Sequence, residues 1–416
     1  MPGTKKMLRI RSKVMPTPMP TNVIRIPLMK NAFFHESATR TALAEFVAGV
    51  GQLSMGSKCR EFEAAFAARQ GRTQAVLFNS GGSANLAMFQ AQKNLGRLKT
   101  GDRIGFSAVT WSTNVMPIMQ LGFEAIPIDC DPTTLNSMSA TALPALIKEK
   151  CRAFFLTNVL GLAGDLDLIK KECAAHKIIL LEDNCEALGT ALPAGTTGNF
   201  GLASSFSFFV AHHLSTIEGG MVSTDDREYA DMLRIVRANG WDRNLSANRQ
   251  KIWRKQSRVS DFEARYTFYD LGYNLRPTEI TGFLGLNQLK SLDTVMTIRE
   301  KNFKKIQAVM DSNADFLPLV WSHLSRVPAF AIPLVCRTSD LKKKYLKRFN
   351  RVGIETRPLI AGNLARQPFF LKYQKRTFKL PGADLIHDQA FYCGNCPDYT
   401  ADEIHAIITC IDPVDA

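Results

Sequence analysis

The sequence of 416 residues has no long hydrophobic run. Apolar residues nowhere continue for the roughly 18–20 positions that a membrane helix needs, so we expect no membrane span. The chain also lacks the cysteine pattern of secreted proteins, because its nine cysteines are odd in number and scattered. Scattered cysteines are typical of reduced thiols, and we therefore expect a cytoplasmic protein without a disulfide framework.

Acidic residues are missing from the first thirty positions, which carry seven Lys and Arg. The whole chain has 52 Lys and Arg against 38 Asp and Glu, a net charge of +14. Half of the excess thus lies in a basic, proline-containing arm (residues 1–30), which we expect to be disordered. A second basic region, residues 337–379, can attract an anionic substrate. No zinc-finger or RNA-binding motif accompanies it, so we expect no nucleic-acid partner.

Short apolar, β-branched or aromatic runs alternate with amphipathic stretches between residues 72 and 225. The pattern predicts seven strands, at 75–78, 103–109, 124–129, 153–158, 178–183, 204–209 and 220–224. Strands that alternate with helices form mostly parallel sheets with helices on both faces, so the predicted fold class is α/β. Such sheets bind ligands beyond the carboxyl ends of their strands, and the residues just after each strand become the site candidates.

Three parts make up the predicted domain organisation. The basic arm (1–30) precedes a large α/β domain (31–285), and a linking helix with a small C-terminal α+β domain follows (286–416). Apolar residues at helical spacing predict one long helix over 282–311. The small domain is expected from a strand at 330–336 and helices at 342–350 and 403–411.

A glycine turn follows the first strand. Residues 79–83 (NSGGS) lead into a helical stretch, so free backbone N–H groups and the positive end of a helix dipole meet there. This turn can hold a phosphate, to which Ser83 would add a hydroxyl. A turn of this composition is, however, most often only a turn.

Polar residues also follow two later strands. The strand at 178–183 ends in Asp183, and a carboxylate there can keep a pyridinium nitrogen protonated or simply cap a helix. His212 and His213 stand in a loop after the next strand, just before a Glu-Gly-Gly run. A tandem pair at this place can act in catalysis or be purely structural.

Together these segments resemble the sugar aminotransferase branch of the fold-type I pyridoxal phosphate enzymes, the DegT/DnrJ/EryC1/StrS family. The similarity covers residues 31–411 and adds the expectation of a mixed, mostly parallel sheet with a smaller C-terminal α+β domain. It rests on five segments in the same order, 79–85 (NSGGSAN), 110–113 (TWST), 181–189 (LEDNCEALG), 207–220 and 272–276 (GYNLR).

The resemblance implies that the cofactor phosphate is held by Gly82, Ser83 and Ser207. In this family the Asn of the Gly-Tyr-Asn motif reaches that phosphate across a dimer interface. Asn274 stands at the matching position and therefore implies a homodimer.

For the cofactor ring, the resemblance implies three contacts. Asp183 would keep the ring nitrogen protonated, Trp111 would stack on the ring, and Glu186 would approach the phenolic oxygen. The cofactor is expected to be pyridoxal 5'-phosphate or its pyridoxamine form.

The lysine that binds this cofactor covalently in the family is missing here. His212 takes its place, and no lysine lies between Lys177 and Lys251. Imidazole forms no stable imine, so lysine-dependent transamination is disfavoured. The runs 211–214 (AHHL) and 218–220 (EGG), with 353–358 and 361–368, resemble instead the subgroup of nucleotide-sugar 3-dehydratases.

Enzymes of this subgroup remove the C3 hydroxyl of a nucleotide-diphosphate 4-keto-6-deoxyhexose in deoxysugar and lipopolysaccharide biosynthesis. The resemblance implies a pyridoxamine phosphate that is held non-covalently and condenses with the C4 ketone. L-glutamate would restore its amine. His212 would be the catalytic base that removes the C4' proton. Arg357 or Arg366 can bind the pyrophosphate or a carboxylate, or be ordinary surface charges.

One branch of the subgroup, which acts on a CDP-sugar, carries a [2Fe–2S] cluster on four closely spaced cysteines. This chain has no cysteine between positions 186 and 335, so that cluster cannot form. Cys393 and Cys396 are a lone pair, and we predict no metal site. The branch acting on GDP-4-keto-6-deoxymannose is thereby favoured. An aminotransferase of the same fold and a catalytically silent binding homologue are the alternatives.

Overall fold

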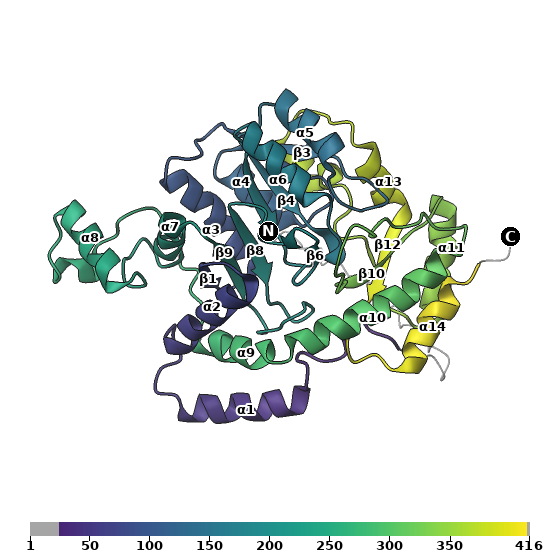
Figure 1. The fold of residues 1–416 in the computed structure, drawn as a ribbon, viewed down its shortest axis with the longest axis horizontal. Helices are drawn as coiled ribbons and strands as arrows, with labels where there is room; N and C mark the ends of the chain where they lie inside the picture. The colour runs from purple at the N-terminus through teal and green to yellow at the C-terminus, as the bar shows by residue number, and fades with distance from the viewer. Residues whose placement is uncertain (1–24, 414–416) are drawn as a thin grey trace, which may run out of the picture.

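A seven-stranded mixed sheet forms the centre of the computed structural model, which describes residues 25–413 (Figure 1). The sheet order is β1-β9-β8-β5-β4-β2-β3. Its strands are β1 (Gln74–Phe78), β2 (Arg103–Ser107), β3 (Glu124–Ile128), β4 (Ala153–Thr157), β5 (Ile179–Asp183), β8 (Ala203–Ser207) and β9 (Gly220–Thr224). All seven predicted strands are thus confirmed, whereas residues 1–24 of the predicted arm lie outside the described residues.

Strand direction brings the candidate residues to one edge of the sheet. Strands β2, β3, β4, β5 and β8 run parallel. Strand β9 is antiparallel to both β8 and β1, so β1 points the same way as β8. The carboxyl ends of β1, β2, β5 and β8 therefore face the same side, where the sequence places its polar candidates.

Helices cover both faces because successive strand residues point to opposite sides. In β1, Val76 and Phe78 join the core beneath α3 (Gly81–Asn94) and α7 (Arg227–Arg237). Ala75 and Leu77 join the core beneath α2 (Ser57–Gln70). Helices α4 (Met116–Gln120), α5 (Ser139–Lys148) and α6 (Leu166–Ala175) pack on the other half of the sheet.

The C-terminal part has a three-stranded antiparallel sheet in the order β10-β12-β11, formed by β10 (Ala331–Val335), β12 (Ala390–Gly394) and β11 (Thr356–Pro358). Its helices are α11 (Ser339–Val352), α12 (Pro368–Tyr373), α13 (Pro381–Gln389) and α14 (Ala401–Ile411). The strand and the two helices predicted here are confirmed. The domain limits at 30 and 285 stay predictions.

The prediction of one helix over 282–311 is wrong. The structure has two helices, α9 (Glu279–Leu289) and α10 (Leu292–Met310), with Ser291 between them at φ −104° and ψ 0°. A Cβ on Gly282 would lie 2.4 Å from the Cys59 nitrogen, so α9 is fixed closely against α2. Helix α10 packs instead on β10 and α14. The turn at Ser291 allows the two helices to follow these different directions.

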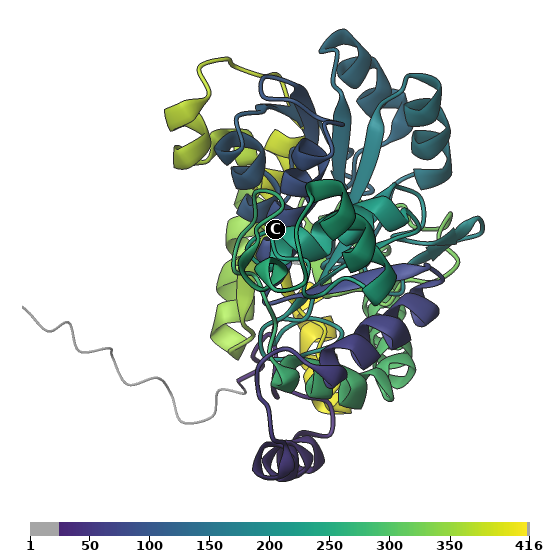
Figure 2. The same cartoon turned by 90° about the vertical axis from the view of Figure 1, so that its left-hand side faces the viewer.

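Two helices lie at the margin of the molecule. Helix α1 (Glu36–Gly49) runs below α9 in Figure 1, and α8 (Ala247–Ser257) stands away from the body on the left. Figure 2 shows the α8 side facing the viewer. Among residues 25–413, no helix combines the length and apolar character needed to cross a membrane.

Candidate functional site

The amino end of α3 touches the carboxyl end of β8. A Cβ on Gly81 would lie 2.7 Å from the Ser207 Cβ, so only glycine allows this approach. The Ser80 hydroxyl caps the helix by accepting from the Ser83 N–H at 3.1 Å. The N–H groups of Gly81 and Gly82 have no acceptor within the helix, because the first turn provides none. Gly82, Ser83 and Ser207 are thereby brought together around free donors.

Asp183 ends β5 as a buried carboxylate held by three neutral donors. Its Oδ2 accepts from Nδ2 of Asn114 at 2.6 Å and from Nδ2 of Asn85 at 3.1 Å, while Oδ1 accepts from the Cys185 N–H at 2.8 Å. No Lys, Arg or His forms an ion pair with it in the described chain. The carboxylate is therefore rigid and can stabilise a cation that enters the site.

Glu186 and Glu182 have different surroundings although they flank the same strand end. The Glu182 carboxylate accepts from the backbone N–H groups of Gly198, Phe200 and Gly201, and this role is structural. Glu186 accepts only from the Leu160 N–H, at 2.9 Å. Burial raises the pKa of Glu186 to about 8, so it carries a proton at neutral pH and can donate a hydrogen bond.

His212 is oriented by the backbone of the loop after β5. Its Nδ1 lies 2.6 Å from the carbonyl oxygen of Cys185. A carbonyl only accepts, so Nδ1 carries the proton and Nε2 keeps its lone pair. Burial, with a contribution from the charge of Arg299, lowers the pKa of His212 to about 4. At neutral pH the ring is a neutral base whose Nε2 is available.

His213 is a structural histidine. The residue is 4% exposed, and its Nε2 lies 2.5 Å from the carbonyl oxygen of Pro328. Burial lowers its pKa well below the usual value. The ring therefore fixes the loop that carries His212 and His213 (the histidine loop) to the segment before Phe330. Its Nδ1 has no partner but is buried, so of the tandem pair only the half-buried His212 presents an accessible base.

Arg299 on α10 was not singled out from the sequence. Its guanidinium is buried and donates to the carbonyl oxygens of Phe330, at 2.7 Å, and Ala211, at 3.5 Å, without an ion pair in the described chain. Arg299 thus joins the histidine loop to the segment around Phe330. The ring centroid of Phe330 is 5.1 Å from that of His212. A single arginine on the apolar face of a helix, between Val295 and Phe303, is the signal that would have revealed it.

Trp111 and Asn274 occupy different places. Trp111 follows β2 and is 57% exposed, so its face is free to stack on a ring. Asn274 is exposed and accepts from Nε of Arg276 at 3.1 Å. It lines a separate cavity of about 480 Å³ with Trp241 and Arg243, and none of the other cofactor candidates lines that cavity.

The two candidate substrate arginines differ in their partners. Arg357, on β11, pairs with Glu355. Burial, with a contribution from the charge of Glu186 and against that of Arg357, raises the pKa of neighbouring Tyr392 to about 12, which places Tyr392 near both side chains. Arg366 forms ion pairs with Asp388 at 2.9 Å and Asp384 at 3.5 Å.

A glycine-bounded helix end, a rigid carboxylate and a neutral histidine thus lie at one edge of the sheet. The model of the DegT/DnrJ/EryC1/StrS aminotransferase family matches residues 35–412. This chain belongs to that family. The predicted fold class is thereby confirmed.

Members of the DegT/DnrJ/EryC1/StrS family similar to this chain include the GDP-4-keto-6-deoxy-D-mannose 3-dehydratase of Escherichia coli O55:H7. It is 34% identical over 358 residues, covering 84% of this chain and 91% of the relative. A structure of GDP-4-keto-6-deoxymannose-3-dehydratase with a trapped PLP-glutamate geminal diamine has a TM-score of 0.85 at 31% identity, covering 93% of this chain and 100% of that one. A mutant of such an enzyme with bound GDP-perosamine has a TM-score of 0.84 at 30% identity, with coverages of 93% and 100%.

Among residues 25–413, no group of three or more His, Cys, Asp and Glu side chains could hold a metal ion. Cys393 and Cys396 are both buried free thiols.

Proposed function

We propose that this protein is a pyridoxamine-phosphate-dependent 3-dehydratase of a nucleotide-diphosphate 4-keto-6-deoxyhexose, with a GDP-linked sugar as the first candidate. The observation that carries the proposal is His212 at the position of the family's lysine, held as a neutral base with Nε2 free. A chain without lysine between 177 and 251 cannot bind its cofactor covalently there. The similar 3-dehydratases support the substrate class and L-glutamate as amine donor.

The residues at the sheet edge fit the cofactor. The close contact between Gly81 and Ser207 leaves the N–H groups of α3 open to a phosphate, where Gly82, Ser83 and Ser207 would hold it. Trp111 would cover the ring, and Asp183 would hold the proton on the ring nitrogen. When bound, the cofactor supplies an electron sink for a carbon attached to its amine.

The geometry assigns a proton-handling role to each of two side chains, His212 and Glu186. His212 would accept the proton from the cofactor-side C4' carbon at Nε2, and would then hold it for the departing C3 hydroxyl of the sugar. Glu186 would keep its own proton and donate a hydrogen bond to the phenolic oxygen, because its pKa of about 8 keeps it protonated at neutral pH. Arg357 is the better candidate for the sugar pyrophosphate, since Arg366 is already neutralised by two carboxylates.

A product analysis tests the proposal. The protein, loaded with pyridoxal 5'-phosphate, is given L-glutamate and GDP-4-keto-6-deoxymannose. We expect a product that lacks the C3 hydroxyl and contains no sugar nitrogen, and borohydride should attach no cofactor to the chain. A 4-amino sugar would establish the aminotransferase alternative, and failure to retain any cofactor would favour the silent binding homologue.

We also propose a homodimer and a cytoplasmic location. The segment that precedes Asn274 supports the dimer, because Phe262, Tyr266 and Leu271 are 77%, 76% and 70% exposed. Several large apolar side chains exposed within one short segment are typical of an interface. The nine free thiols support the location.

Mixing two inactive variants tests whether Asn274 acts across the dimer. Subunits with His212→Asn and subunits with Asn274→Ala are refolded together. If Asn274 completes the partner's site, half of the sites in each mixed dimer contain neither change. Random pairing should then restore about a quarter of the wild-type activity. Absence of any recovery in a mixture that forms dimers would place both residues in the same subunit's site.

The pH profile tests the link between Arg299 and His212. Because the folded pKa of His212 is about 4, the base form is present above that pH, and kcat/KM should fall only as the pH approaches it. Arg299→Met removes a buried positive charge and should raise the pKa of His212, moving the acid limb to higher pH. Arg299→Lys keeps the charge and should keep the limb in place. An unchanged limb in a folded Arg299→Met protein would show that Arg299 does not tune His212.

A further inference from the structure

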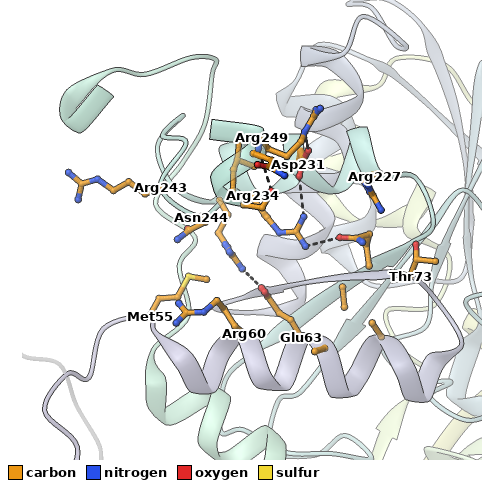
Figure 3. Close-up of a pocket in the computed structure, with 18 residues that line it drawn as sticks. Met55, Arg60, Glu63, Thr73, Arg227, Asp231, Arg234, Arg243, Asn244 and Arg249 are labelled. Atoms are coloured by element: carbon orange, nitrogen blue, oxygen red, sulfur yellow. Dashed lines mark hydrogen bonds and ion pairs between the residues drawn. The ribbon is translucent and has the colours of Figure 1, made fainter. Parts of the chain in front are cut away.

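A second cavity lies between α2 and α7, along the exposed edge of β1. Its volume is about 740 Å³, within the range of roughly 300–1,000 Å³ that small-molecule sites occupy. Figure 3 shows Arg60 and Glu63 approaching it from α2, and Arg227, Asp231 and Arg234 from α7. We call this cavity the β1-edge groove.

Positive charge dominates the β1-edge groove. Six arginines and only two carboxylates line it. Asp231 is shared by Arg234 and Arg249, and Glu63 pairs with Arg237 at 2.5 Å. Arg60 and Arg227 are exposed and have no ion pair in the described chain. The arginine charge is therefore only partly neutralised by the protein itself.

Arg237 places a buried guanidinium with unpaired N–H groups at the groove. Its side chain is 0% exposed, and its Nη1 donates to Glu63 and, at 2.6 Å, to the Leu77 carbonyl oxygen. Its Nε and Nη2 are buried without any acceptor. Unpaired donors of a buried guanidinium are costly, and the positive charge of Arg237, which lines the groove, favours an anion above it.

The surroundings of Arg234 also favour an anion in the groove. Burial lowers its pKa, and nearby Arg237 lowers it further, although Glu63 and Asp231 oppose this. Crowded, desolvated guanidinium groups attract a multivalent anion more strongly than a single surface arginine does.

None of the residues assigned to the cofactor or to catalysis lines the β1-edge groove. The groove adjoins the cavity of Asn274, with which it shares Met55, Arg243 and Asn244, but Asn274 itself does not line it. The groove follows β1 toward Thr73 at its amino end, whereas the cofactor candidates gather at the carboxyl ends of the strands. An anion bound there would not occupy the proposed reaction centre.

We propose that the β1-edge groove binds a small polyphosphate anion of the pyrophosphate class, with Arg60, Arg227 and Arg234 around it and Arg237 beneath it. Forked guanidinium groups match phosphate oxygens in pairs, which favours such an anion over a monocarboxylate. The proposal does not rest on the proposed function, because it uses none of the residues assigned to the reaction.

Calorimetric titration with inorganic pyrophosphate tests the proposal on the protein loaded with pyridoxal 5'-phosphate, so that the cofactor's own phosphate site is filled. The test variant is Arg60→Gln with Arg227→Gln, two exposed positions whose change leaves the buried Arg237–Glu63 pair intact. The control is Arg40→Gln with Lys344→Gln, which lowers the net charge equally on exposed positions outside the groove.

We expect binding to the loaded wild type and to the control, and an affinity at least about tenfold weaker in the test variant, because two charge-assisted contacts are lost. Equal weakening in the control would mean general charge attraction and would overturn the proposal. Binding that disappears once the cofactor is loaded would place the anion in the α3 cradle, and an unaffected test variant would place it elsewhere. Each of these outcomes leaves the product analysis of the proposed reaction unchanged.

Discussion

His212→Asn is expected to lower kcat for dehydration by about 10²–10⁴-fold, the usual contribution of a general base. The Asn amide can replace Nδ1–H as donor to the Cys185 carbonyl, now 2.6 Å from the ring, so the loop should keep its shape. It has no basic nitrogen to take the place of Nε2. Steady-state kinetics measures the loss, and the cofactor absorbance shows that binding is retained.

His213→Asn is the matched control for this experiment. His213 is anchored to Pro328 and is buried, so its replacement should lower the melting temperature more than the turnover of the folded protein. A larger loss of turnover in folded His213→Asn than in His212→Asn would contradict the assignment of the base.

Asp183→Asn is expected to reduce kcat by about 10²–10³-fold, as when a preorganised electrostatic group is removed from an active site. The variant cannot hold a proton on the cofactor's ring nitrogen by charge. Its new amide donor would also face the amides of Asn85 and Asn114, which now donate to Oδ2. Kinetics measures the loss of turnover, the cofactor spectrum reports the protonation of its ring, and thermal unfolding reports the loss of stability.

Asn114→Ala separates charge from packing at this position. It removes the 2.6 Å donor to Asp183 and leaves the carboxylate in place. We expect a loss of stability of about 1–3 kcal/mol, because a buried acceptor loses one partner, and a smaller loss of turnover than in Asp183→Asn. Full activity in folded Asp183→Asn would instead show that Asp183 only supports the loop.

The sheet could be predicted from local pattern because its strands are short, apolar and separated by helices. Their burial on both faces needs such residues at nearly every strand position. The break between α9 and α10 could not be predicted, because apolar spacing continues through Ser291. The close contact of Gly282 with α2 and the packing of α10 on the C-terminal part, which together decide the bend, are tertiary.

The site shows the same division between local and tertiary information. The missing lysine at His212 is a property of the sequence, and it alone excludes a covalent cofactor at that point. The protonated Nδ1, the lowered pKa and the Arg299 contact arise from groups that are distant in the chain and meet only on folding.

The sequence by itself determined the fold class, the absence of a cysteine cluster and the chemistry that the residues at the strand ends can perform. The tertiary structure decided which of these residues work together. It set His212 apart from His213, Glu186 from Glu182, and Asn274 from the other cofactor candidates. The physical reason is that residue type sets the available chemistry, whereas burial and the direction of each hydrogen bond set protonation and access.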